Sequence, residues 1–242
     1  MGKIDYMLIL LIIAIACVGA ISSNGILSQK DEQTLQFKSL NPPEVKVLGS
    51  NNLGIVFKSG PYGNSNSTTK IAIIVGVHPL EINAHRAIVT SLNTLSKSLN
   101  RSYYVYSIQV TKDRKSYNNG RMNGQLLAKY VVNDIKKNNF DLAVDIHSNR
   151  GFYEQKRFIC APVKDNKSQA TALSVDNKIP WLVYYLPPKE KGPSSPNYVT
   201  VPLIRSGTPA VVYETYMYEP YDLTVKHAVD FISVIDKINL KK

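Results

Sequence analysis

The chain has 242 residues, 44% of them hydrophobic, which is typical of a globular protein with a real core and excludes a fully disordered chain. The net charge of +11 permits nucleic-acid binding, but no run of Lys and Arg is longer than two residues and no nucleic-acid-binding motif is present. We therefore expect no nucleic-acid partner and a basic surface that faces anionic lipid or wall polymer.

An apolar segment opens the chain. Residues 6–21 are almost unbroken apolar sequence behind one lysine, which is the pattern of either a membrane-spanning helix or a signal peptide. We expect an uncleaved single-pass anchor within 1–24 that enters the membrane through residues 6–22. A cleaved signal stays open because Ala14-Ile-Ala16 resembles a cleavage site, and lipidation of Cys17 directly after it stays open too.

All of these alternatives place the rest of the chain outside the cytoplasm, either at the cell membrane or secreted. Residues 25–43 are polar and lack periodicity, so they predict a tether to a single domain at 44–242. Cys160 is alone in this domain, and no disulfide is expected within it. Three Asn-x-Ser/Thr sequons agree with an extracytoplasmic domain and begin at Asn66, Asn100 and Asn166.

Within the domain, the hydrophobic pattern alternates between strands and helices. It predicts a hairpin followed by longer apolar strands, at 45–48, 55–57, 71–75, 103–110, 141–147 and 209–214. Apolar residues at helical spacing predict helices over 84–99, 127–135 and 225–235. Loops and shorter elements are expected at 111–123, 156–161, 167–175, 181–186 and 186–198. This order implies right-handed crossovers and an α/β fold with a mostly parallel central sheet and helices on both faces.

Side chains that can bind metal stand at the ends of three predicted strands. His78 and Glu81 follow the first long strand, His147 ends another, and Glu214 ends the last. Because ligands bind at the carboxyl ends of strands in an open α/β sheet, we expect these side chains to meet. Two His and one Glu as ligands, with a free Glu to handle a proton, form the residue set of a hydrolytic zinc site. We therefore predict one Zn²⁺ ion held by His78, Glu81 and His147.

The other two histidines compete weakly for these roles. A local set of His78, Glu81 and His85 is conceivable, but His85 lies on the side of a predicted helix that points away from the strand ends. We predict that His85 and His227 are ordinary surface positions.

The remaining acidic residues have open assignments. Glu214 is the candidate general base, since a carboxylate after an apolar strand is costly unless it is paired, hydrated or used. A salt bridge to a loop arginine is its alternative use, and Glu219 is the substitute base. Asp145 is expected to accept the second ring N–H of His147, or only to cap the end of the sheet.

The ordered set of His78-Pro-Leu-Glu81, Asp145-Ile-His147 and Glu214 resembles the zinc carboxypeptidase superfamily, nearest its succinylglutamate desuccinylase/aspartoacylase-type branch. The resemblance covers about residues 70–216. It implies zinc binding by His78, Glu81 and His147, with Glu214 acting first as base and then as proton donor.

The same resemblance implies arginines in the substrate site. The family uses Arg and an Asn-Arg pair to hold the substrate carboxylate and to polarise the scissile carbonyl. This chain departs from that pattern, because it has Asn119-Gly-Arg121 in the expected loop and an intact Asn149-Arg150 only after His147. The candidates for substrate binding are therefore Arg114, Asn119, Arg121 and Arg150, with Arg121 also a candidate catalytic residue.

The function expected from the sequence is an extracytoplasmic zinc hydrolase that cleaves an amide bond. Its substrate would be a peptide, including a cell-wall peptide, or an N-acyl amino acid that carries a carboxylate. The alternative is a non-catalytic module that keeps the fold and binds peptide or wall polymer. A third interpretation, a binder of nucleic acid or lipid headgroups, predicts a steep salt dependence of binding.

Overall fold

The structure, a computed structural model, describes residues 43–188 and 194–240. The anchor expected within 1–24 lies outside the described residues, as does the tether apart from residue 43. Among the described helices, none is both long and apolar enough to cross a membrane.

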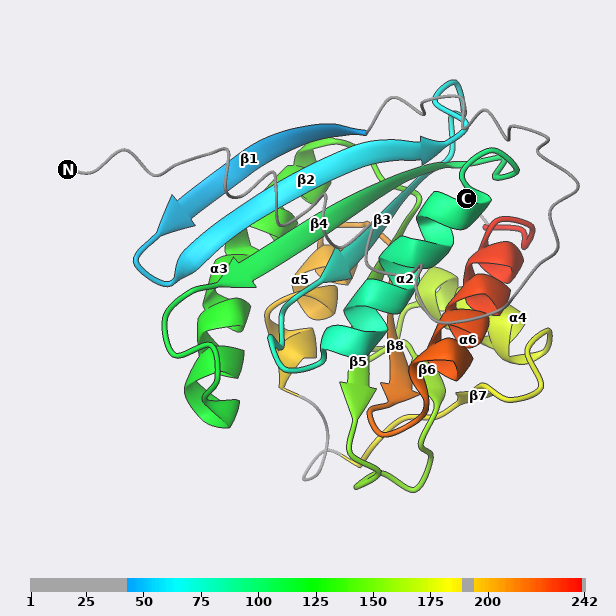
Figure 1. The fold of residues 1–242 in the computed structure, drawn as a ribbon. Helices are drawn as coiled ribbons and strands as arrows, with labels where there is room; N and C mark the ends of the chain where they lie inside the picture. The colour runs from blue at the N-terminus through cyan, green and yellow to red at the C-terminus, as the bar shows by residue number, and fades with distance from the viewer. Residues whose placement is uncertain (1–42, 189–193, 241–242) are drawn as a thin grey trace, which may run out of the picture. The chain divides into compact units, whose positions relative to one another are not determined.

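Within the described residues, one eight-stranded sheet runs through the domain in the order β1-β2-β4-β3-β5-β8-β6-β7 (Figure 1). Strands β4, β3, β5 and β8 are its centre and pair in parallel. Strands β1 and β2 add an antiparallel hairpin at one edge, and β6 runs antiparallel to β8 at the other. The strands are β1 (Glu44–Asn51), β2 (Gly54–Gly63), β3 (Lys70–Val75), β4 (Ser102–Val110), β5 (Leu142–Asn149), β6 (Phe158–Cys160), β7 (Val183–Tyr184) and β8 (Ala210–Tyr216).

The sheet is therefore mixed, and the predicted parallel pairing is confirmed for its four central strands. The reason lies in burial. All eight residues of β5 are buried, which is typical of a parallel strand covered on both faces, whereas β1 at the edge is largely exposed.

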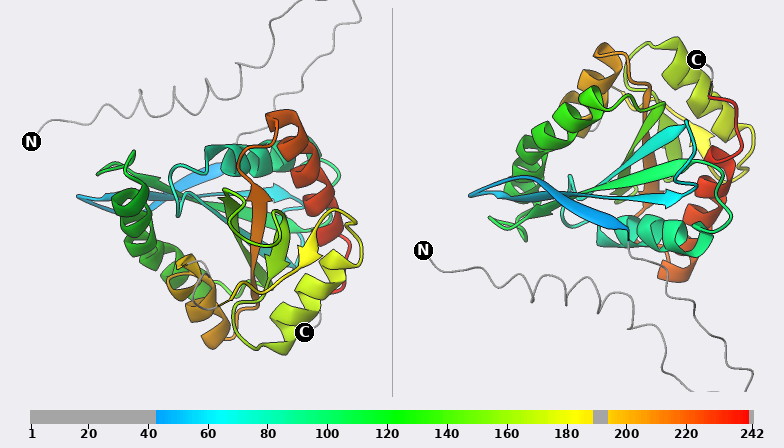
Figure 2. Two further views of the ribbon diagram at one scale, coloured as in Figure 1. Left: turned by 90° about the horizontal axis from the view of Figure 1, so that it is seen from below. Right: turned by 90° about the horizontal axis from the view of Figure 1, so that it is seen from above.

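Helices cover both faces of the sheet, as the alternating pattern predicted (Figure 2). On one face, a first core cluster is covered by α2 (Ile82–Leu95), α4 (Asn166–Asp176) and α6 (Tyr221–Ile235). On the other face, α3 (Tyr117–Lys137) and α5 (Thr200–Arg205) cover a second core cluster. The strand alternation divides β3 between the two cores, since Ile71 and Ile73 belong to the first and Ala72 and Ile74 to the second.

The polar loop expected at 111–123 is wrong over its second half. Helix α3 already begins at Tyr117, where the Ser116 hydroxyl accepts a hydrogen bond of 3.3 Å from the backbone N–H of Asn119. The first two turns of α3 carry Asn and Gly in place of apolar residues, so hydrophobic periodicity does not reveal them. Helix α5 was likewise not predicted, and the 3-10 helix η1 (Ser195–Asn197) lies in the expected proline-rich loop.

Candidate metal centre

The backbone between β3 and α2 folds His78 and Glu81 toward each other. Gly76 ends the strand with φ of +89°, and a Cβ there would lie 2.1 Å from the carbonyl oxygen of Ile108, so only glycine fits. A turn follows in which the N–H of Glu81 donates to the carbonyl of His78 over 3.1 Å. Pro79 occupies the second position of this turn, which suits its fixed φ. As a result, His78 Nδ1 lies 2.8 Å from Glu81 Oε1.

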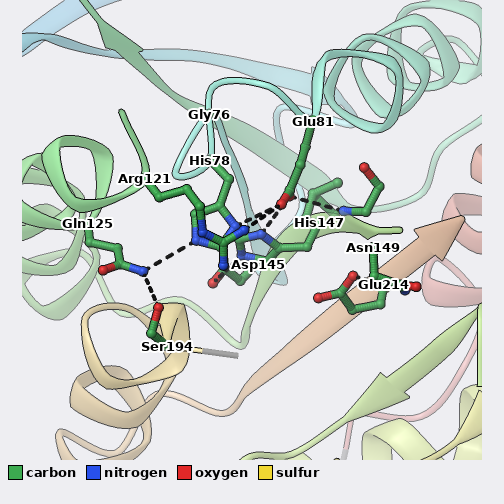
Figure 3. A network of polar contacts seen from close by, with 12 residues as sticks. Gly76, His78, Glu81, Arg121, Gln125, Asp145, His147, Asn149, Ser194 and Glu214 are labelled. Carbon is green, nitrogen blue, oxygen red and sulfur yellow. Dashed lines mark hydrogen bonds and ion pairs between the residues drawn. The ribbon is translucent and has the colours of Figure 1, made fainter. Parts of the chain in front are cut away.

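The third predicted ligand comes from β5. His147 Nδ1 lies 2.9 Å from Glu81 Oε2, and the backbone N–H of Ser148 donates to the same oxygen over 3.0 Å. One ligand atom from each of His78, Glu81 and His147 lies within 4.8 Å of the others, and all three side chains are buried. Residues from two strand ends therefore converge on one point, as Figure 3 shows.

The chemistry of this cluster fits a bound cation. Glu81, Asp145 and Glu214 are all buried, and Oδ1 of Asp145 has no hydrogen-bond partner among the described residues. Buried carboxylates are costly unless a positive charge compensates them. Two imidazole nitrogens and one carboxylate oxygen form a donor set that zinc takes with one position left open.

Charges within the cluster lower the pKa of Glu81 and raise that of His147. Burial disfavours ionisation of Glu81, but His78 and His147 outweigh that cost and hold its pKa below the usual range. Burial also disfavours a charged His147, yet Asp145 and Glu81 raise its pKa well above the ordinary value. Asp145 Oδ2 lies 3.0 Å from His147 Nε2, on the side of the ring away from Glu81. Asp145 thus stands where a partner for the second ring nitrogen would stand.

Glu214 lies beside His147 and has no cation of its own. The two residues are direct partners in the β5–β8 register, and neighbouring residues of parallel strands point to the same face. Burial raises the pKa of Glu214 to about 8, although His147 opposes the shift. Asn149 Nδ2 donates to Glu214 over 3.3 Å, and no described Lys or Arg pairs with it. The salt bridge weighed as an alternative is therefore not formed within the described residues.

A pocket of about 270 Å³ opens over this cluster. Its lining includes His78, Glu81 and Glu214 together with Tyr117, Arg121 and Arg150. The guanidinium groups of Arg121 and Arg150 lie 4.9 and 4.5 Å from the centre of the Tyr117 ring. Arg121 Nη1 is 3.5 Å from Glu81 Oε1, while the buried Nε of Arg150 has no hydrogen-bond partner among the described residues.

The structure separates the four predicted substrate-binding residues. Arg121 and Arg150 line the pocket, whereas Arg114 and Asn119 are exposed and do not. Asn119 and Arg121 are two positions apart on α3, so their side chains point to different sides of the helix.

The interpretation of His85 and His227 as surface positions is wrong. The half-buried His85 places Nε2 3.3 Å from the backbone N of Gly76 and 3.2 Å from the carbonyl oxygen of Ile146, where it braces the strand ends. His227 is buried, lies 3.4 Å from Glu219 and stacks on Trp181 at 3.9 Å. Neither belongs to the converging ligand set of the described residues. Glu219 is held by Arg157 at 2.8 Å and does not line the pocket, so it does not replace Glu214.

Sequence reasoning missed two contributors from α3. Tyr117 and Gln125 stand four residues before and after Arg121, and Gln125 contacts His78 (Figure 3). Their spacing is a recognisable helical signal, but only once α3 is known to begin at Tyr117.

No protein-family model and no curated protein sequence matches the chain. Solved structures do match its fold. A metallo-carboxypeptidase from Burkholderia cenocepacia superposes with a TM-score of 0.56 at 11% identity, over 81% of this chain and 65% of that one. A metallo-carboxypeptidase from Pseudomonas aeruginosa, solved with (2-guanidinoethylmercapto)succinic acid, superposes with a TM-score of 0.51 at 10% identity, over 79% of this chain and 64% of that one.

The described domain therefore has the metallo-carboxypeptidase fold, and the predicted resemblance to the zinc carboxypeptidase superfamily is confirmed at that level. The chain spans less than two thirds of the length of these two solved chains. The aspartoacylase-type branch stays a prediction.

Proposed function

We propose that this chain is a zinc-dependent hydrolase of the metallo-carboxypeptidase superfamily that cleaves an amide bond. The observation that carries the proposal is the convergence of His78, Glu81 and His147 on one point, under a pocket that His78, Glu81 and Glu214 line. The apolar segment at 1–24 supports an extracytoplasmic location for the domain.

In this proposal His78, Glu81 and His147 hold the zinc. A bound Zn²⁺ ion supplies a Lewis acid that polarises a carbonyl group and acidifies water. Glu214 takes the proton from the attacking water and returns it to the leaving nitrogen, because it is a buried carboxyl group that lines the pocket beside the ligands. Burial of the cluster keeps bulk water from competing for this proton.

The arginines set the substrate class. Arg150 directs an unpartnered N–H within the pocket wall, and Arg121 lies near the ligands, so both suit an anionic group. A peptide with a free C-terminal carboxylate, or an N-acyl amino acid, carries both a carboxylate and a scissile amide. Arg150 is the proposed carboxylate anchor, and Arg121 the group that steadies the developing negative charge.

The test is amide hydrolysis by the zinc-loaded, full-length chain on a panel of peptides and N-acyl amino acids. Glu214→Gln should lower kcat by about 10²–10⁴-fold, the usual contribution of a general base. Its zinc content should stay that of the wild type. Glu154→Gln, which changes an exposed carboxylate, is the matched control and should keep full activity.

Full activity of Glu214→Gln would contradict the mechanism. A wild-type protein that takes up zinc and binds acidic peptides but hydrolyses none would instead be the binding module that keeps the fold.

A further inference from the structure

The two candidate histidine ligands are backed by different chemical groups. Behind His147, Nε2 faces the carboxylate of Asp145 at 3.0 Å. Behind His78, the ring Nε2 lies 3.3 Å from the side-chain amide nitrogen of Gln125. Gln125 is buried, and its amide also donates to the Ser194 hydroxyl over 2.7 Å (Figure 3). An amide can both donate and accept a hydrogen bond, whereas an ionised carboxylate can only accept one.

The contact between Gln125 and His78 links the amide orientation to the form of the ring. With the amide N–H directed at Nε2, His78 needs a lone pair there, and its single ring proton then sits on Nδ1 and faces Glu81. Binding of a metal through Nδ1 requires the lone pair on that atom instead. The ring then loses its Nδ1 proton and gains one on Nε2, where an acceptor is needed.

Gln125 can supply that acceptor without moving its backbone. A half-turn of the amide about its last bond exchanges Oε1 for Nε2 at nearly the same place. Ser194 can follow the exchange, because a hydroxyl both accepts and donates. An ionised carboxylate only accepts, so it would favour the Nε2–H form of His78 at all times.

The packing of α3 holds Gln125 at this distance. A Cβ on Gly124 would lie 2.1 Å from the carbonyl oxygen of Val77, and one on Gly120 would lie 3.1 Å from Cγ of Pro79. Glycine inside a helix costs about 1 kcal/mol of stability relative to alanine. At these two positions glycine allows α3 to approach the His78 turn closely.

We propose that Gln125 is the positioning residue of His78, and that its amide turns over when metal binds so that it supports both tautomers of the ring. This inference rests on the metal-binding half of the proposed function and is independent of the hydrolytic step.

The first experiment measures zinc affinity of the full-length chain by competition with a chromophoric chelator. Gln125→Leu, which keeps the size but removes the acceptor, should weaken zinc binding by about 10–100-fold. Gln125→Glu restores an acceptor and should bind zinc at least as tightly as the wild type. Gln109→Leu makes the same change at an exposed position and should have no effect.

The second experiment reads the tautomer of His78 directly, from ¹⁵N shifts of labelled imidazole. Metal-free wild type should carry the proton on Nδ1, and zinc-loaded wild type on Nε2. Metal-free Gln125→Glu should already carry it on Nε2.

The outcomes separate the two proposals. Wild-type zinc affinity in Gln125→Leu, or an Nε2 proton in the metal-free wild type, would overturn the role of Gln125 and leave the metal site standing. Weak binding by Gln125→Glu as well as Gln125→Leu would mean that the position is merely structural. A wild type that binds no zinc would overturn both proposals.

Discussion

Two buried clusters of histidine and carboxylate lie in the described domain, and they differ in how completely their polar groups are paired. In the first, His78 and His147 flank Glu81, with Asp145 and Glu214 close by. In the second, Glu219 receives Nε and Nη2 of Arg157 at 2.9 and 2.8 Å, and His227 lies between Glu219 and the ring of Trp181.

The second cluster is complete, since the guanidinium neutralises its carboxylate and the histidine is stacked and hydrogen-bonded. The first leaves Oδ1 of Asp145 unpaired among the described residues and opens into a pocket. A histidine beside a glutamate therefore does not identify a metal site by itself. The distinguishing signs are a buried carboxylate oxygen without a partner and ligand atoms that converge on one point.

The sharpest way to test this contrast is to remove one histidine from each cluster. His147→Ala should weaken zinc binding more than about 100-fold, since loss of a ligand exceeds the effect of losing a supporting group. His227→Ala should keep full zinc content and lose about 1–3 kcal/mol of stability with its hydrogen bond. Metal analysis and thermal unfolding of both purified variants measure this. Equal zinc loss in the two variants would mean that the first cluster is not a metal site distinct from the second.

A smaller effect is expected at the mouth of the pocket. Arg150→Ala should lower kcat/KM by about 10–100-fold for substrates with a carboxylate, mainly through KM, because a charge-assisted hydrogen bond is lost. Arg114→Ala removes an exposed arginine outside the pocket and should change kcat/KM less than about twofold. Steady-state kinetics on matched amide and carboxylate substrates decide the point. If the Arg114 variant were the more impaired, the assignment of the anchor would be reversed.

The smallest effect concerns pH and the metal-free protein. The ordinary pKa of a glutamate, 4.5, applies in the unfolded chain, and burial raises that of Glu214 to about 8 in the fold. The folded state therefore holds this proton longer, so the contribution of Glu214 to stability is complete below pH 4.5 and is lost as the pH rises to about 8. Between pH 5 and 8, the melting temperature of chelator-treated wild type should fall more than that of Glu214→Gln. Parallel curves would rule out a buried, protonated Glu214.

The sequence predicts the central strands and the convergence of His78, Glu81 and His147, because both depend on patterns that are visible in the chain. Continuous apolar runs such as 71–75 specify buried strands, and the polar residues directly after them meet because parallel strands end at one edge. The start of α3 is not predictable in the same way. Its first turns are polar and glycine-containing, and their helical state is set by the Ser116 cap and by packing on the His78 turn.

The same cause explains why the sequence left several candidates for substrate binding. With 111–123 interpreted as a loop, Arg114, Asn119 and Arg121 were all candidates. A helix beginning at Tyr117 selects Arg121 and brings in Gln125. His227 was misjudged because its partners Glu219 and Trp181 are distant enough in sequence that only the folded structure reveals them.

The residues Tyr117, Arg121 and Gln125 recur at every fourth position, so they share one stripe of a single rigid helix. One end of this stripe contacts the arginines of the pocket mouth and the other contacts His78. In the proposed function, a shift of the helix moves all three residues together and so affects the metal ligands and the substrate arginines at once. The two binding free energies would then be coupled, and by thermodynamic linkage metal and substrate would alter each other's affinity by the same factor.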